Sequence, residues 1–244
     1  MTRDGRPSRI KDLRLFGAEA KRPGISEATA FGRRLAWWLN GQEFTIGHEP
    51  ALYVTFDPAL PQGSVEPKPQ RFTPDDWWFR EVSVGVPDDF PGDDDASVAT
   101  AGIIAALQML RPDCTGLIER AAQTVATEGE ACRFLLRSKE GAKDTLEIST
   151  TIGVWPGPSL LYAGMTDKAT GTYREAPPVE LRFYDDGVLL AGKVKVVRRG
   201  VDLVARTSTP ARLVADSHGG GVSWHVDSFI EAQRPVLSGL LKFR

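Results

Sequence analysis

The stretch CRFLLRSKEGAKDTLEISTTIGV, residues 132–154, decides the fold class. It contains two predicted strands, at residues 132–137 and 146–154, with turn-forming residues between them. The same rhythm continues downstream and predicts further strands over residues 159–163, 179–184, 188–197, 201–207 and 221–227. Short strands separated by turns are typical of an antiparallel meander rather than of alternating βαβ units.

Two turns carry the hairpin signals of this meander. Asp185-Asp186-Gly187 lies between two alternating runs, and Asp-Gly favours the tight turn of a two-residue hairpin. Arg199-Gly200 predicts a second hairpin. Residues 228–244 predict a short helix that is interrupted at Pro235.

Upstream of residue 132 the sequence predicts both helices and strands. Phe31, Leu35 and Leu39 recur at helical spacing, so a helix should run from Ser26 to the Asn40-Gly41 stop. Further predictions are strands at residues 51–56 and 77–86, helices at 96–110 and 115–127, and no regular structure in the proline-rich residues 57–76. The expected fold is α+β: an N-terminal helix/strand/helix region, then a mostly antiparallel β-meander packed with three or four helices.

Length and composition indicate a globular protein. The 244 residues are 41% hydrophobic and 25% charged, with a net charge of −2. We expect a single α+β domain over residues 26–244, with a boundary near residues 112–115 as the alternative. Residues 1–22 hold seven basic and three acidic side chains, so the rest of the chain carries −6. Residues 1–25 are therefore predicted to be a basic, flexible arm.

The apolar stretches and the cysteine content of the sequence predict a cytoplasmic protein. No stretch approaches the roughly 20 apolar residues of a membrane span, and residues 1–25 lack the apolar core of an export signal. Two cysteines, Cys114 and Cys132, are too few for a disulfide framework. We expect a reducing compartment and no membrane association.

Residues 88–95, DDFPGDDD, form an acidic segment with five aspartates: Asp88, Asp89, Asp93, Asp94 and Asp95. Clustered carboxylates raise one another's pKa, so a counter-charge is expected. The spacing resembles the DDxxxD metal site of prenyl-transfer enzymes, but the intervening Pro-Gly pair prevents the continuous helix that such a site needs. The segment also lacks the closing glutamate of a calcium-binding EF-hand.

A helix cap accounts for part of this charge. Asp94 or Asp95 is expected to cap the helix that follows, where the helix dipole favours negative charge. One or two carboxylates suffice for that purpose. The surplus favours the positive charge of a partner over a metal ion.

The histidines offer a second set of candidates. His218 opens an HGGG run, but no GxSxG nucleophile motif exists in the chain, so the run predicts a glycine-rich turn. His225 and Asp227 are two apart on a predicted strand and should project from one face. They predict a structural hydrogen bond, or, together with His218, a metal or acid–base cluster.

Cys114 and the tryptophans complete the candidates. Cys114 lies at a predicted helix start, where the dipole can lower its pKa, although a core cysteine is the favoured interpretation. The apolar face of the first helix includes Trp38, and its neighbour Trp37 then points elsewhere. Trp37 or Trp77 is therefore predicted to be an exposed contact anchor, with burial under the proline-rich loop as the alternative.

The favoured function is non-catalytic protein binding, through the acidic segment and the exposed tryptophans, to a partner with a basic surface. A bacterial accessory or toxin-neutralising, immunity-type protein fits this description. No cofactor is expected, and the acidic body argues against nucleic acid. One alternative is a metal-assisted hydrolase that uses Asp88, Asp93, His218, His225 and Asp227. Another is a structural subunit whose basic arm inserts into a neighbour.

Overall fold

The computed structural model describes residues 7–17, 25–69, 78–92 and 95–243. Contacts divide the chain into two compact units, Met1–Gly129 and Glu130–Arg244. Within the described ranges, five α-helices and thirteen strands in three sheets confirm the α+β class. None of the helices in these ranges is both long and apolar enough to cross a bilayer. The single domain expected over residues 26–244 stays a prediction.

The first unit is built on a mixed four-stranded sheet in the order β1-β2-β4-β3. Strands β1, β2 and β4 are parallel, and β3 pairs antiparallel with β4 at the edge. The elements are β1 (Asp12–Gly17), α1 (Ser26–Gly41), β2 (Ala51–Asp57), β3 (Val65–Pro67), β4 (Phe79–Gly85), α2 (Asp95–Leu110), the 3-10 turn η1 (Pro112–Cys114) and α3 (Thr115–Glu128).

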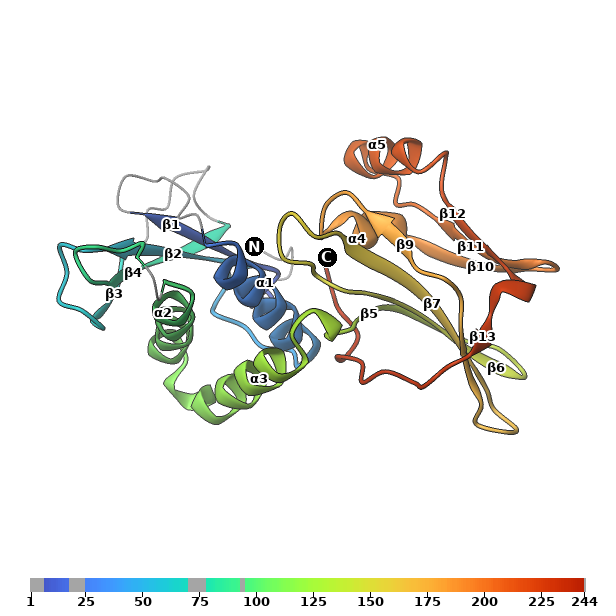
Figure 1. The fold of residues 1–244 in the computed structure, drawn as a ribbon, viewed down its shortest axis with the longest axis horizontal. Helices are drawn as coiled ribbons and strands as arrows, with labels where there is room; N and C mark the ends of the chain where they lie inside the picture. Colours follow the sequence, from blue (N-terminus) through green and yellow to red (C-terminus); the bar gives the residue numbers. More distant parts are fainter. Residues whose placement is uncertain (1–6, 18–24, 70–77, 93–94, 244) are drawn as a thin grey trace. The chain divides into compact units, whose positions relative to one another are not determined.

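Glycines bring helices α1 and α2 close to this sheet. A Cβ at Gly32 of α1 would lie 2.8 Å from Leu13 of β1. A Cβ at Gly102 of α2 would lie 2.9 Å from Val84 of β4 and 3.0 Å from Phe56 of β2. Helix α3 packs against α1 and α2 (Figure 1). The predicted helix from Ser26 and the strand over residues 51–56 are confirmed.

Two predictions for the first unit are wrong. Residues 12–17 of the predicted arm form strand β1, because pairing with β2 buries Leu13 and Leu15. The proline-rich stretch contains strand β3, which pairs with β4 through Val65–Pro67. Arm residues 1–6 and 18–24 lie outside the described residues.

The second unit contains two antiparallel sheets, which confirms the predicted meander. The larger has the order β13-β8-β7-β6-β5, with β9 also paired to β7; the smaller has the order β10-β11-β12 (Figure 1). The elements are β5 (Phe134–Glu140), β6 (Asp144–Thr150), β7 (Ser159–Asp167), β8 (Tyr173–Glu175), β9 (Val179–Leu181), α4 (Asp186–Leu190), β10 (Lys193–Val197), β11 (Gly200–Val204), α5 (Thr209–Ser217), β12 (Val222–His225), the 3-10 turn η3 (Val226–Ser228) and β13 (Ile230–Glu231). A further 3-10 turn, η2 (Gly129–Ala131), precedes β5.

The hairpin predicted at Asp185-Asp186-Gly187 is wrong, because these residues begin helix α4. The buried Asp186 carboxylate accepts the Phe183 N–H at 2.9 Å. Gly187 serves close packing: a Cβ there would lie 3.3 Å from both Leu136 and Leu181. By contrast, the hairpin at Arg199-Gly200 is confirmed between β10 and β11.

Two further predictions for the second unit are wrong. The strand predicted over residues 188–197 begins only at Lys193, because residues 188–190 belong to α4. Helix α5, whose Ser208 cap accepts the Ala211 N–H at 3.4 Å, was not predicted. The predicted C-terminal helix is instead strand β13 followed by an extended strap, residues 232–243, that runs from β8 to β5. The strap is anchored where Ala232 donates to the Tyr173 carbonyl at 3.1 Å and where Ser238 donates to the Arg133 carbonyl at 2.9 Å (Figure 1).

Candidate functional site

The acidic segment lies beyond the carboxyl ends of the parallel strands of the first unit. Asp57 is the last residue of β2, and its carbonyl accepts the Val86 N–H just after β4 at 3.4 Å. Asp88 and Asp89 follow directly and are exposed. Ligands of open parallel sheets characteristically bind at this edge. The carboxylates of the acidic segment therefore lie at the edge where such sheets usually bind ligands.

Individual aspartates of the segment differ in what they contact. Asp95 begins α2, and its side chain accepts the Gly92 N–H, so one carboxylate stabilises the turn into the helix. Across the part of the chain that the structure describes, Asp88 and Asp89 make no side-chain hydrogen bond or ion pair. Asp93 and Asp94 lie outside that part. Among the described aspartates of the segment, Asp88 and Asp89 therefore carry the surplus charge.

The histidine candidates do not form a metal centre by themselves. Among the described residues, no three His, Cys, Asp or Glu side chains gather closely enough to hold a metal ion. His225 ends β12, and Asp227 lies in η3 rather than on the strand as predicted. Their side chains still meet at the surface, with His225 Nδ1 3.2 Å from Asp227 Oδ2. The hydrolase alternative draws on both units and stays a prediction.

The HGGG run is a turn, as expected, between α5 and β12. Gly219, Gly220 and Gly221 have φ values of 69°, 98° and 154°, which L side chains rarely adopt. His218 ends α5 and donates its N–H to the Ala215 carbonyl at 3.0 Å. The glycines are therefore required by the backbone.

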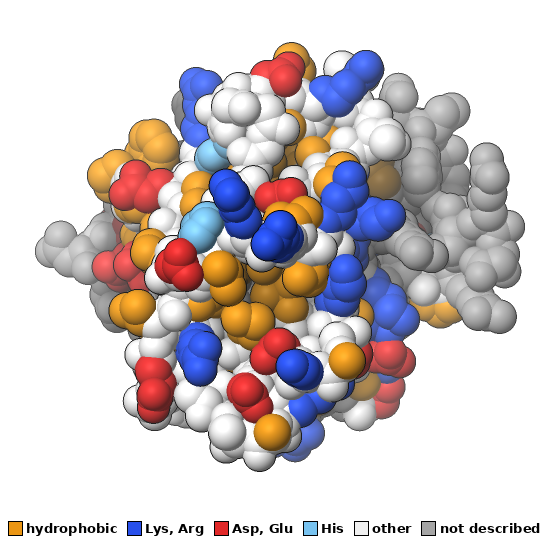
Figure 2. Space-filling model, turned by 90° about the vertical axis from the view of Figure 1, so that its right-hand side faces the viewer, with side chains coloured by type: hydrophobic (Ala, Val, Ile, Leu, Met, Phe, Trp, Pro, Cys, Tyr) orange, Lys and Arg blue, Asp and Glu red, His pale blue; other side chains and the backbone are white. Residues whose placement is uncertain are grey.

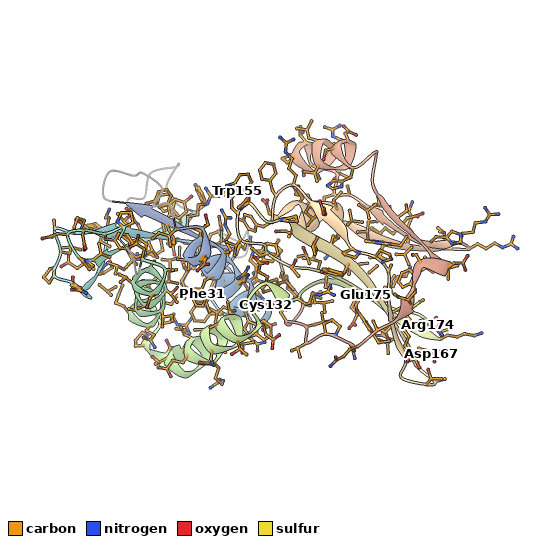
Figure 3. All side chains as sticks on the ribbon, viewed as in Figure 1. Phe31, Cys132, Trp155, Asp167, Arg174 and Glu175 are labelled. Atoms are coloured by element: carbon orange, nitrogen blue, oxygen red, sulfur yellow. The ribbon has the colours of Figure 1, made fainter. Side chains whose placement is uncertain are left out.

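The predicted exposure of Trp37 is wrong. Its side chain is 1% exposed and its Nε1 donates to the Lys11 carbonyl at 3.1 Å, because the chain leading into β1 covers this side of α1. Trp77 lies outside the described residues. Trp155, in the loop between β6 and β7, is 75% exposed (Figure 3). The Pro156-Gly157-Pro158 that follows it was the available signal for a projecting loop.

Cys114 is not an activated nucleophile. Burial and the neighbouring Asp113 carboxylate raise the pKa of the Cys114 thiol, although Arg111 opposes them. Arg111 donates to both Asp113 oxygens, at 2.8 and 2.7 Å, and so lowers the pKa of that carboxyl. The predicted lowering by the helix dipole is outweighed by this arrangement.

A charged cluster on one face of the large sheet was not predicted from the sequence. It comprises Arg133, Glu147, Tyr162, Tyr173, Glu175 and the strap residue Arg234. Glu147 pairs with Gly164, and Gly164 with Glu175, so the two glutamates share a face across β6, β7 and β8. Two strand spacings, roughly 10 Å, separate their backbones. Figure 3 labels Glu175 nearer the middle of the sheet than Arg174 and Asp167.

Arg133 holds Glu175 firmly. One guanidinium nitrogen, Nη2, lies 2.9 and 2.8 Å from the two Glu175 oxygens, and the guanidinium carbon lies 3.0 Å from the centre of the Tyr162 ring. The Tyr173 hydroxyl donates to Glu175 Oε1 at 2.7 Å. Burial and then Glu175 raise the pKa of Tyr173, so the phenol stays protonated as a donor.

Glu147 makes fewer hydrogen bonds than Glu175. Its side chain is only 9% exposed, and Oε1 accepts Arg234 Nη2 at 2.7 Å. Oε2 is buried and has no hydrogen-bond partner among the described residues. A buried carboxylate oxygen without a donor is costly, so this atom is equipped to accept a further hydrogen bond.

The second unit also exposes apolar side chains around the β10–β11 hairpin. Val196, Val197 and Val226 are all exposed, and the Val226 N–H donates to the Arg199 carbonyl at 2.8 Å. Figure 2 shows apolar side chains in the middle of this end of the unit, among Lys, Arg, Asp and Glu side chains.

Comparison of the chain with protein-family models, with curated proteins and with solved structures finds no match.

Proposed function

We propose that the protein is a non-catalytic binding protein whose acidic segment contacts a partner with a basic surface. The observation that carries this proposal is the state of Asp88 and Asp89. Both are exposed beyond β4, and within the described residues neither forms an ion pair. Adjacent carboxylates repel each other, and a partner's Lys or Arg side chains relieve that repulsion while steering association.

An exposed tryptophan supplies a second contact. Trp155 replaces Trp37 in this role, because a ring that is 75% exposed offers a large amphipathic area for a partner to bury. The proposed setting is a reducing cytoplasm, because neither Cys114 nor Cys132 is in a disulfide; that the host is bacterial is part of the proposal. An accessory or immunity-type complex subunit, which covers the basic site of another protein, fits these features.

The test is a quantitative pull-down from host extract with Asp88→Asn/Asp89→Asn. We expect a partner that is captured by the wild type to be depleted, with an affinity that falls as salt is raised. The matched control is Glu66→Gln/Glu128→Gln, which removes the same charge from two exposed positions of the same unit.

The comparison between the two variants decides the result. Depletion by the aspartate variant alone locates the contact at the acidic segment. Equal capture by both variants and the wild type would remove the acidic segment from the proposal. Trp155→Ala then measures the contribution of the second contact separately.

A further inference from the structure

We propose that Glu147 and Thr166 form a binding site for a guanidinium group, and that Arg234 of the C-terminal strap occupies the same carboxylate as an internal latch. The site lies in the second unit. It is separate from the acidic segment and does not depend on the function proposed for that segment.

The first argument is a pair of buried oxygens. Glu147 Oε2 and Thr166 Oγ1 are both buried and without a hydrogen-bond partner in the described residues. Glu147 pairs with Gly164, and Thr166 lies two residues further along β7 on the same face. Diagonal neighbours of this kind have backbones about 7–8 Å apart. Both atoms can accept hydrogen bonds, so a ligand that donates two satisfies both.

The second argument is charge balance. Arg133 neutralises Glu175 through its paired contacts at 2.9 and 2.8 Å. Glu147 is left with one negative charge in a side chain that is nine-tenths buried, and Arg234 supplies the balancing cation. The site therefore requires one cation, and an incoming cation must exchange with Arg234 rather than add to it.

The third argument is how loosely Arg234 fits. Its side chain is 52% exposed and reaches only Oε1, through Nη2 at 2.7 Å. Residues 233–235 of the strap belong to no strand or bridge; the backbone anchors are at Ala232 and Ser238. The latch is thus a half-exposed side chain on the least anchored part of the strap.

An untethered guanidinium matches the site better than this latch. Its planar fork can donate to both oxygens of a carboxylate at once, and its remaining N–H groups are available to Thr166. An ammonium is a point charge without that fork. The guanidinium can come from a small molecule or from an arginine side chain of a protein.

The experiment titrates L-argininamide and the peptide acetyl-Gly-Arg-Gly-amide into the full chain and into Arg234→Gln, by calorimetry. L-citrullinamide, which has the same α-amine but ends in an uncharged urea, is the control of the same shape. If the latch occupies Glu147 nine-tenths of the time, its removal should tighten argininamide binding by about tenfold. Citrullinamide should bind neither protein, and Asp88→Asn/Asp89→Asn should leave the affinity unchanged.

Two results would overturn the proposal: equal affinity of the wild type and Arg234→Gln, or equal affinity for argininamide and citrullinamide. Because Arg234→Gln leaves the buried Glu147 carboxylate without its cation, the titrations are run below the unfolding temperature of the variant, as measured by circular dichroism. Adding Glu147→Gln should abolish binding. Binding of the peptide alone identifies a protein arginine as the source, whereas equal binding of argininamide identifies a small molecule; either supports the site.

Discussion

At the residue scale, Gly164 decides whether the charged cluster can form. A Cβ at this position would lie 2.1 Å from the Tyr173 hydroxyl oxygen, which is held over β7 by its bond to Glu175. We expect Gly164→Ala to displace the phenol and lower the free energy of unfolding of the second unit by roughly 1–3 kcal/mol. Urea denaturation measures the change.

Gly116→Ala is the control for this substitution. Gly116 lies in α3, and a Cβ there would meet only the end of the Arg120 side chain at 3.5 Å. Alanine should stabilise that helix by about 0.5–1 kcal/mol. A neutral Gly164→Ala would mean that the Tyr173–Glu175 bond does not constrain the sheet.

A second prediction at this scale concerns the reactivity of Cys114. Burial raises the pKa of the thiol most, Asp113 raises it further and Arg111 lowers it, so Asp113→Asn removes one of the two effects that oppose the arginine. The thiol pKa should fall, and alkylation by iodoacetamide at pH 7.5 should become several times faster, because the thiolate is the reacting form. Mass spectrometry of the labelled peptide separates Cys114 from the buried Cys132. An unchanged rate would show that burial alone sets the pKa.

Single residues also explain which parts of the site could be predicted. The acidic segment is visible in the sequence because its five charges are contiguous. Glu147 and Glu175 are 28 positions apart and become neighbours only through the register of β6, β7 and β8. Alternating polar residues on a strand are normally a solvated face, so nothing in the sequence marked these two as buried.

At the element scale, strand β1 is the strongest departure from the predicted flexible arm. Leu13 is fully buried and contacts the α1 helix at Gly32. We expect Leu13→Ala to reduce the free energy of unfolding of the first unit by about 2–5 kcal/mol, from lost burial and the cavity left behind. Leu213→Ala, at a position that is 66% exposed, should change stability by less than about 0.5 kcal/mol. If residues 12–17 were flexible, both substitutions would change the free energy of unfolding by similarly small amounts.

The elements divide by the range of the interactions that form them. Helices α1, α2 and α3 were predicted closely, because the apolar spacing that forms them is local. Strand β1 was not predicted, because its partner β2 follows only after helix α1 in the sequence. The alternation of Leu13 and Leu15 with Arg14 and Phe16 was the local sign of a strand. At Asp186-Gly187 the packing of α4 on the sheet outweighed the local preference for a hairpin turn. Pairing and packing between residues far apart in the sequence are the interactions that the local sequence patterns could not predict.

At the scale of the whole molecule, the two compact units carry different candidate sites: the acidic segment in the first, the charged cluster in the second. If the units are thermodynamically independent, the substitutions above should act separately. Leu13→Ala should then shift only the unfolding transition of the first unit, and Gly164→Ala only that of the second. The double variant should be additive within about 0.5 kcal/mol.

Tryptophan fluorescence can separate the two transitions. The first unit contains four tryptophans (Trp37, Trp38, Trp77 and Trp78) and the second contains two (Trp155 and Trp224), so replacing all those of one unit by Phe leaves only the reporters of the other. If both probes move together for each substitution, residues 26–244 unfold as the single cooperative domain expected from the sequence. If they move separately, the two units unfold independently. Loss of the partner that binds the acidic segment then cannot change binding at Glu147 through global unfolding, so the two binding assays report on independent sites.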